Sequence, residues 1–245
     1  MIRAAVLFLS LCALPAAAAE CRKESFRDKP YTICEVDLTR DRLELFLKDE
    51  NDAVYGYFGN INAALAKQGQ RLGFATNAGM YHEDRSPVGH YIENGTEVQR
   101  VIPNAGPGNF GLLPNGVLCL RDGRADVFET LDYIAQAPEC RAATQSGPML
   151  VIQSQLHPRF LPDSTSRFIR NGVGTTADGR RAIFAISDSA VTFFEFGTLF
   201  RDHLNVPNAL YFDGNVSRLR APDLGRSGSG FTPLGPIIGV VEPAQ

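Results

Sequence analysis

The 245-residue sequence contains no tryptophan, only four histidines, and a formal net charge of just −3 at pH 7. The lack of tryptophan argues against the stacking platforms of many carbohydrate-binding modules, although tyrosine and phenylalanine could serve instead. The small acidic charge argues against a nucleic-acid partner, because such proteins carry strongly basic surfaces. No Cys-x-x-Cys and no paired histidine spacing occurs, so neither a redox motif nor a metal site is indicated. We expect no cofactor; a divalent cation held by carboxylates and phosphate would leave no such spacing.

Long apolar runs are also missing, apart from the amino terminus. There Arg3 is followed by an apolar run over residues 4–14 and by the small residues Ala17, Ala18 and Ala19. A positive start, a short apolar run and small residues predict an export signal over residues 1–19. The run is too short for a membrane span, and no later run reaches that length. We therefore expect a periplasmic or secreted protein without a transmembrane segment.

Removal of the signal leaves four cysteines: Cys21, Cys34, Cys119 and Cys140. An even number of cysteines in an oxidising compartment indicates two disulfides. Four cysteines allow three pairings. Of these we expect the pairs of sequence neighbours, Cys21–Cys34 and Cys119–Cys140; four buried free thiols are the alternative.

The remaining chain, residues 20–245, predicts one α+β domain with mixed or antiparallel sheets and few helices. Alternating apolar residues with β-branched and aromatic side chains predict strands at 31–36, 43–47, 72–76, 125–128, 149–153, 172–176, 181–186, 209–212 and 237–241. Turn signals predict two hairpins, one joining 89–92 to 98–102 and one joining 110–113 to 117–120. Helices are expected over 61–68, capped by Asn60, and over about 193–204.

The most informative segment is the predicted strand 209–212, which ends at Asp213-Gly214. A buried strand that ends in Asp-Gly places one carboxylate at the edge of a sheet, where the chain turns and a ligand can approach. Active-site acids are often held on a rigid element beside a loop. Asp213 is therefore a candidate catalytic residue, although a simple turn at the strand end would leave the same pattern.

Three other segments combine polar residues with glycine at predicted strand ends. They are Asn77-Ala78-Gly79, Ser146-Gly147-Pro148, and Arg170 followed by Gly172-Val173-Gly174. Glycine either adopts a positive φ or lets the backbone approach a ligand closely. Together with Asp213-Gly214 and Ser217, these segments predict the lining of one pocket.

In this order, the four segments resemble those of the phosphodiester glycosidase family, to which the lysosomal "uncovering" enzyme domain belongs. The resemblance covers roughly residues 73–240 and suggests a bacterial, exported member. Two departures occur: Ala78 stands where the family has a glycine, and Asn215-Val216 replaces the glycines after Asp-Gly. The identity of the sugar is therefore not carried over.

The resemblance implies hydrolysis of a sugar-1-phosphodiester through an oxocarbenium-like transition state. The leaving phosphate has a second pKa of about 6, so general-acid help is less important than stabilisation of the phosphate. We assign Asp213 as base or nucleophile and Arg170 to the phosphate, because a guanidinium matches phosphate geometry. Asp188, after the strand 181–186, is the candidate second carboxylate. The expected substrate-binding residues are Asn77, Gly79, Ser146, Gly147, Gly172, Gly214 and Ser217.

Two other functions stay open from the sequence. The first is an ordinary O-glycosidase that uses two carboxylates, Asp188 and Asp213. The second is a non-catalytic envelope module that binds a glycan or a protein, which the altered positions Ala78 and Asn215 would favour.

Overall fold

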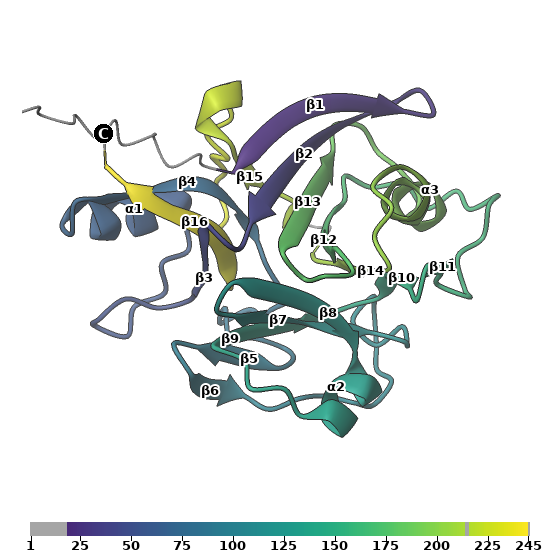
Figure 1. The fold of residues 1–245 in the computed structure, drawn as a ribbon, viewed down its shortest axis with the longest axis horizontal. Coiled ribbons are helices and arrows are strands. Elements are labelled where there is room, and N and C mark those ends of the chain that lie inside the picture. The colour runs from purple at the N-terminus through teal and green to yellow at the C-terminus, as the bar shows by residue number, and fades with distance from the viewer. Residues whose placement is uncertain (1–18, 214–215, 245) are drawn as a thin grey trace, which may run out of the picture.

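The computed structural model describes residues 19–213 and 216–244. The predicted export signal therefore lies outside the described residues, except for Ala19, and so does Gly214. Three antiparallel sheets form the framework of the described chain (Figure 1). The α+β class expected from the sequence is confirmed.

The largest sheet has seven strands in the order β1-β2-β13-β12-β14-β10-β11. Their bounds are β1 Glu20–Phe26, β2 Lys29–Asp37, β13 Arg181–Ser187, β12 Asn171–Thr175, β14 Asn208–Tyr211, β10 Met149–Ile152 and β11 Gln155–Leu156. Its central strands are buried on both faces. Ile33 and Ile183 point to the side covered by helix α3 (Phe193–Thr198), whereas the neighbouring Cys34 and Phe184 point to the opposite side. This alternation is the period of two that a strand imposes on its side chains.

The two smaller sheets lie on the other side of the molecule. One has the order β15-β4-β16-β3, with β15 Leu219–Arg220, β4 Gln70–Asn77, β16 Ile237–Pro243 and β3 Arg42–Phe46; helix α1 (Phe58–Ala66) packs on it. The other has the order β6-β5-β9-β7-β8, with β6 Thr96–Gln99, β5 Tyr91–Glu93, β9 Ala142–Ser146, β7 Gly116–Arg121 and β8 Arg124–Glu129. Helix α2 (Thr130–Gln136) follows β8, and a 3₁₀ turn spans Pro222–Leu224.

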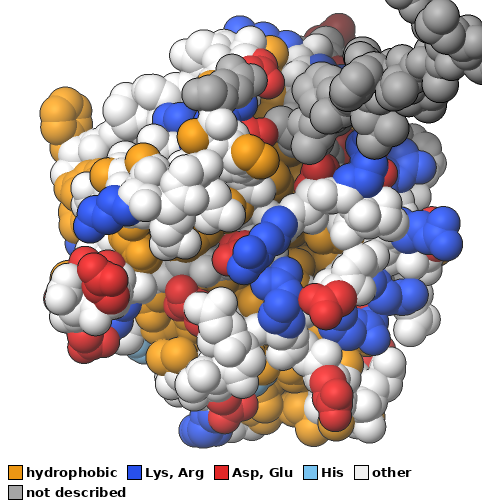
Figure 2. Space-filling view, turned by 60° about the vertical axis from the view of Figure 1, so that its left-hand side comes forward, with side chains coloured by type: hydrophobic (Ala, Val, Ile, Leu, Met, Phe, Trp, Pro, Cys, Tyr) orange, Lys and Arg blue, Asp and Glu red, His pale blue; other side chains and the backbone are white. Residues whose placement is uncertain are grey.

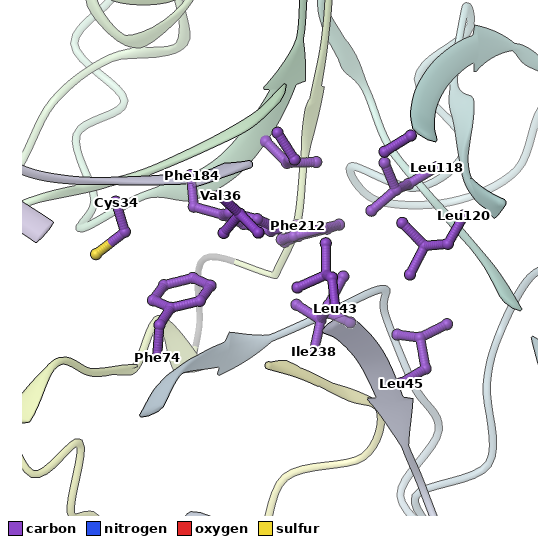
Figure 3. Close-up of a cluster of buried hydrophobic side chains, with 14 of the residues drawn as sticks. Cys34, Val36, Leu43, Leu45, Phe74, Leu118, Leu120, Phe184, Phe212 and Ile238 are labelled. Carbon is purple, nitrogen blue, oxygen red and sulfur yellow. The ribbon is translucent and has the colours of Figure 1, made fainter. Parts of the chain in front are cut away.

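Side chains from all three sheets meet in one hydrophobic core. Phe212, directly after β14, lies at its centre, between Phe184 of the large sheet, Leu43 of β3 and Leu118 of β7 (Figure 3). Phe212 is completely buried. The residue that precedes Asp213 is thus anchored where the three sheets join, which holds the start of the next loop in place.

Most predicted strands are present within one or two residues, and the hairpin of β5 and β6 is confirmed in shortened form. The second predicted hairpin is wrong, because residues 110–115 form no strand and β7 pairs with β8 and β9 instead. The buried Asn115 side chain explains this: its Nδ2 donates to Phe110 O (3.0 Å) and its Oδ1 accepts from Thr130 Oγ1 (2.7 Å). These bonds satisfy the buried polar groups of the Asn115 side chain while the segment remains a loop.

The helix predictions need two adjustments. Asn60 does not cap α1; Tyr57 is the N-cap residue, and Asn60 Nδ2 donates to Tyr55 O (2.7 Å) from within the first turn. The second predicted helix is present as α3, but it continues as a π-helical turn over Leu199–His203.

Both predicted disulfides are confirmed. Cys21–Cys34 links directly paired residues of β1 and β2, and Cys119–Cys140 ties β7 to the loop after α2. Among the helices of the described residues, none is long and apolar enough to cross a membrane.

Candidate functional site

The register of the large sheet brings several of the predicted site residues to one edge of it, where β12 begins and β13 and β14 end. Asn171 at the start of β12 pairs with Ile186 near the end of β13, and Gly172 pairs with Tyr211 at the end of β14. Antiparallel neighbours therefore begin and end together at this edge. The residues just beyond these strand ends are Arg170, Asp188 and Asp213.

A buried amide joins this edge to the four-stranded sheet. Asn171 Nδ2 lies 3.1 Å from Asn77 Oδ1, 3.2 Å from Asn77 O and 3.0 Å from Thr76 Oγ1. Asn77 is the last residue of β4 and is fully buried. Buried amides must be hydrogen-bonded, so the pairing of Asn77 with Asn171 fixes the two sheet edges against each other.

The same network holds the backbone of Asp213. Asn77 Nδ2 donates to the carbonyl oxygen of Asp213 (3.2 Å). Ser217 Oγ lies 3.3 Å from that carbonyl and 3.1 Å from Asn171 Oδ1. Three of the predicted residues, Asn77, Asp213 and Ser217, are thus in contact with one another. These contacts engage the backbone carbonyl of Asp213.

Tyr81 and two arginines share the electrostatic environment of that carboxylate. Burial raises the pKa of Tyr81, and the negative charge of Asp213 raises it further, whereas the charges of Arg85 and Arg218 lower it. The Arg85 guanidinium lies over the Tyr81 ring, 5.4 Å from its centroid. The backbone N–H of Arg218 donates to Asn77 Oδ1 (2.9 Å). The carboxylate, the phenol and two cations therefore form one cluster.

The sequence prediction missed Tyr81, Arg85 and Arg218. Two of them were adjacent to recognised motifs: Tyr81 stands two residues after Gly79, and Arg218 directly follows Ser217. Their position next to these motifs was the available signal.

Arg170 has a different environment from the one expected. Its side chain is 1% exposed, and its guanidinium carbon lies 3.6 Å from the ring centroid of Phe193. Nε donates to Val191 O (2.9 Å), and one terminal nitrogen donates to Ser166 O (3.2 Å). Burial lowers the pKa of Arg170, while a hydrogen bond with Tyr211 opposes that effect. The cation is thus held by carbonyl groups and aromatic rings.

Asp188 lies at the end of β13 and is bound by two partners. Its Oδ2 accepts from Thr32 Oγ1 (2.9 Å), and its Oδ1 forms an ion pair with Arg226. Arg226 also donates to Thr32 Oγ1 (2.8 Å). This pairing links the loop that contains Arg226 to Thr32 of β2. It also occupies the carboxylate that we expected to be the second acid.

The predicted glycines are required by close packing. A Cβ at Gly79 would lie 2.4 Å from the carbonyl oxygen of Gln145, and one at Gly172 would lie 2.6 Å from Leu210 O. At Gly147, which precedes a cis proline, a Cβ would come within 2.9 Å of Phe110 O. Packing alone therefore explains why glycine occupies these three positions, and no ligand is needed to explain it. Ser146 is fully buried, and its Oγ has no hydrogen-bond partner among the described residues.

A groove of about 290 Å³ lies beside Arg218. Its walls come from the start of α1 and from the Gly/Ser-rich loop, including Tyr57, Gly59, Arg220 and Ser229. Within the described residues no group of three acidic, histidine or cysteine side chains could hold a metal ion. On the face that Figure 2 shows, basic and acidic side chains alternate, which is unlike a surface for a polyanion.

Comparisons with known proteins identify the family of the chain. Residues 70–232 match the phosphodiester glycosidase family, and the chain belongs to that family of hydrolases. The uncharacterized Escherichia coli (strain K12) protein YigE is 33% identical over 215 residues, which are 87% of this chain and 84% of YigE. The resemblance seen in the four sequence segments is therefore confirmed.

Two solved structures share the fold. The catalytic domain of zebrafish N-acetylglucosamine-1-phosphodiester alpha-N-acetylglucosaminidase, auto-inhibited by its pro-peptide, has a TM-score of 0.64 and 12% identity, over 94% of this chain and 84% of that one. A hypothetical protein from Synechocystis has a TM-score of 0.59 and 14% identity, over 90% and 61% of the two chains. At such low identity these structures support the fold alone.

Proposed function

We propose that this chain is an exported hydrolase that cleaves the glycosidic bond of a sugar-1-phosphodiester, with Asp213 as the base or nucleophile. The observation that carries the proposal is the position of Asp213. It follows the fully buried Phe212, and its backbone carbonyl accepts a hydrogen bond from the fully buried Asn77. Such support on both sides favours a carboxylate held in one place, as catalysis requires.

The family supports the reaction class, and the chemistry explains why one carboxylate would be enough. Cleavage of the bond between the sugar C1 and the phosphate oxygen forms an oxocarbenium-like transition state and expels a phosphate ester. That ester leaves without much protonation, because its second pKa is about 6. Asp213 would act on the sugar side, either by attacking C1 or by activating water.

We propose a positioning role for Arg170 rather than direct contact with the phosphate. Its stacking on Phe193 and its hydrogen bonds to Val191 O and Ser166 O favour a cation that holds the loops beside the start of β12. The backbone N–H of Arg170 also donates to Ser187 Oγ (2.9 Å), which adds the end of β13 to the same arrangement.

The contacts of Asp188 weaken the two-carboxylate alternative, because both of its oxygens are already engaged, one by Thr32 and the other by Arg226. A panel of sugar-1-phosphodiesters and matched uncharged glycosides would separate the two reactions. Turnover of the phosphodiesters alone would support the proposal. Binding of these compounds without turnover would support the non-catalytic module.

Replacement of Asp213 is the direct test. Asp213→Asn keeps the size of the side chain and the backbone contacts, and we expect a loss of turnover of at least about 10³-fold, since it removes the reacting group. Asp178→Asn, in the exposed turn between β12 and β13 at the opposite end of these strands, is the matched control. Undiminished activity of Asp213→Asn, with an unchanged melting temperature, would remove Asp213 from the mechanism.

Export would agree with the two disulfides, which persist in oxidising compartments. Mass spectrometry of the mature protein from the bacterial periplasm or medium, with a new terminus near Glu20, would establish it.

A further inference from the structure

We propose that Arg85 and Arg218 bind the phosphate group of the substrate beside Tyr81, between Asp213 and the groove that Arg218 helps to line. The inference rests on the proposed function and replaces the phosphate contact that the sequence had suggested for Arg170.

Arg85 is held in an unusual backbone conformation. Its φ is +74°, in the left-handed region that a residue with a side chain rarely adopts. The surrounding turn enforces it, because Arg85 N donates to His82 O (2.9 Å) and His82 N donates to Ser86 O (2.8 Å). The result is a side chain that folds back over the ring of Tyr81. Strained residues of this kind concentrate at functional sites, where strain places a group that the chemistry needs.

Arg218 acts on the same phenol, because its positive charge lowers the pKa of Tyr81. Its backbone is fixed by Asn77, and its guanidinium packs against Gly230, where an added Cβ would lie 2.3 Å from the guanidinium carbon. Glycine at position 230 therefore leaves the room that this cation occupies. Among the described residues, neither Arg85 nor Arg218 forms an ion pair, in contrast to Arg226 with Asp188. Both guanidinium groups are thus ready for an external anion.

The chemistry of the substrate explains the need for two cations here. A phosphodiester is negatively charged, and so is Asp213, so their approach is repulsive unless positive charge lies beside them. Guanidinium forks match phosphate oxygens in pairs, and two of them oppose the charge that develops as the ester leaves. Tyr81 stays protonated at neutral pH, since its pKa is raised, and its hydroxyl can donate a third hydrogen bond.

The groove indicates where the rest of the substrate would lie. With the sugar next to Asp213 and the phosphate on Arg85 and Arg218, the alcohol portion extends along the groove toward Ser229 and Tyr57. The exposed Phe231 stands at the same loop, and Tyr57 donates to its carbonyl oxygen (3.0 Å). The walls there combine serine hydroxyls and glycine backbone with the apolar side chains of Phe58 and Leu234.

Two variants remove the cations with little damage to the fold. Arg85→Gly deletes the guanidinium and tolerates the left-handed backbone. Arg218→Ala deletes the side chain and keeps the backbone N–H that donates to Asn77. Arg180→Ala is the control, because Arg180 is exposed in the turn between β12 and β13, away from this edge of the sheet. Thermal unfolding of each variant checks that it folds.

Binding is measured by ¹H–¹⁵N NMR titration of the intact protein with inorganic phosphate, following the arginine Nε–H signals. We expect saturable shifts, with the dissociation constant raised about tenfold or more in Arg85→Gly and in Arg218→Ala. Arg180→Ala should stay within twofold of the original chain. Unchanged phosphate binding in both folded variants, or no saturable shift of either arginine, overturns the inference.

The readout separates this inference from the proposed function. Lost phosphate binding in the two variants supports the phosphate site even if no phosphodiester is cleaved, an outcome that would reject only the proposed function. Retained phosphate binding in both variants, with turnover abolished by Asp213→Asn, would reject only the phosphate site.

Discussion

Glu93 makes the stability of this protein depend on pH in a direction that is unusual for an acid. It is the last residue of β5, and burial raises its pKa from the usual value of 4.5 to about 7. The nearby charge of Glu44 adds to the increase, whereas hydrogen bonds from Tyr91 and from the backbone of Leu47 oppose it. Tyr91 Oη donates to Glu93 Oε2 over 3.1 Å. Burial outweighs these bonds.

The magnitude follows from proton linkage. Between pH 4.5 and about 7 the folded protein binds more protons at Glu93 than the unfolded chain does. The contribution of Glu93 to the free energy of unfolding therefore falls as the pH rises through this window and stays constant above it. Each unit of pKa difference corresponds to about 1.4 kcal/mol, so the full effect is about 3 kcal/mol.

Glu93→Gln removes the titration and keeps the shape of the side chain. Urea unfolding of both proteins, followed by circular dichroism from pH 4.5 to 8, measures the effect. We expect the stability of the variant relative to the original chain to increase by about 3 kcal/mol over this range. His157, whose pKa burial lowers, has an opposite influence that is the same in both proteins and cancels in the difference. Parallel stability curves would refute the reasoning.

Three further predictions concern packing and cross-links. Phe212→Ala should reduce the free energy of unfolding by about 3–5 kcal/mol, because it empties the centre of the core, and urea unfolding measures this. Replacing Cys119 and Cys140 by alanine should cost about 3 kcal/mol, since the disulfide closes a separation of 21 residues; an unchanged melting temperature would contradict this. Gly79→Ala should lower both stability and turnover, because the new Cβ would meet the carbonyl oxygen of Gln145; a fully active variant would show that the strand end can shift.

The architecture was largely readable from the sequence because strands have a strict period. The patterns around Ile33 and Phe184 predicted strands over 31–36 and 181–186, and both are present in the large sheet. The disulfide partners were likewise neighbours along the chain. The loop before β7 was misread, because a Pro-Asn-Gly segment predicts a hairpin turn unless a distant partner binds it. Here the partner is Thr130, whose hydroxyl donates a hydrogen bond to the buried Asn115 side chain.

The sequence by itself determined which strand ends carry polar residues and glycines, since these patterns are local. Only the tertiary structure decided which side chains meet there. Arginine has a long side chain whose direction depends on neighbours from distant segments, and that is why Arg170 lies on Phe193 while Arg85 and Arg218 approach Tyr81. The position of Asp213 at the end of its strand was therefore predictable, whereas the surroundings of Arg85, Arg170 and Arg218 were decided only when the sheets packed together.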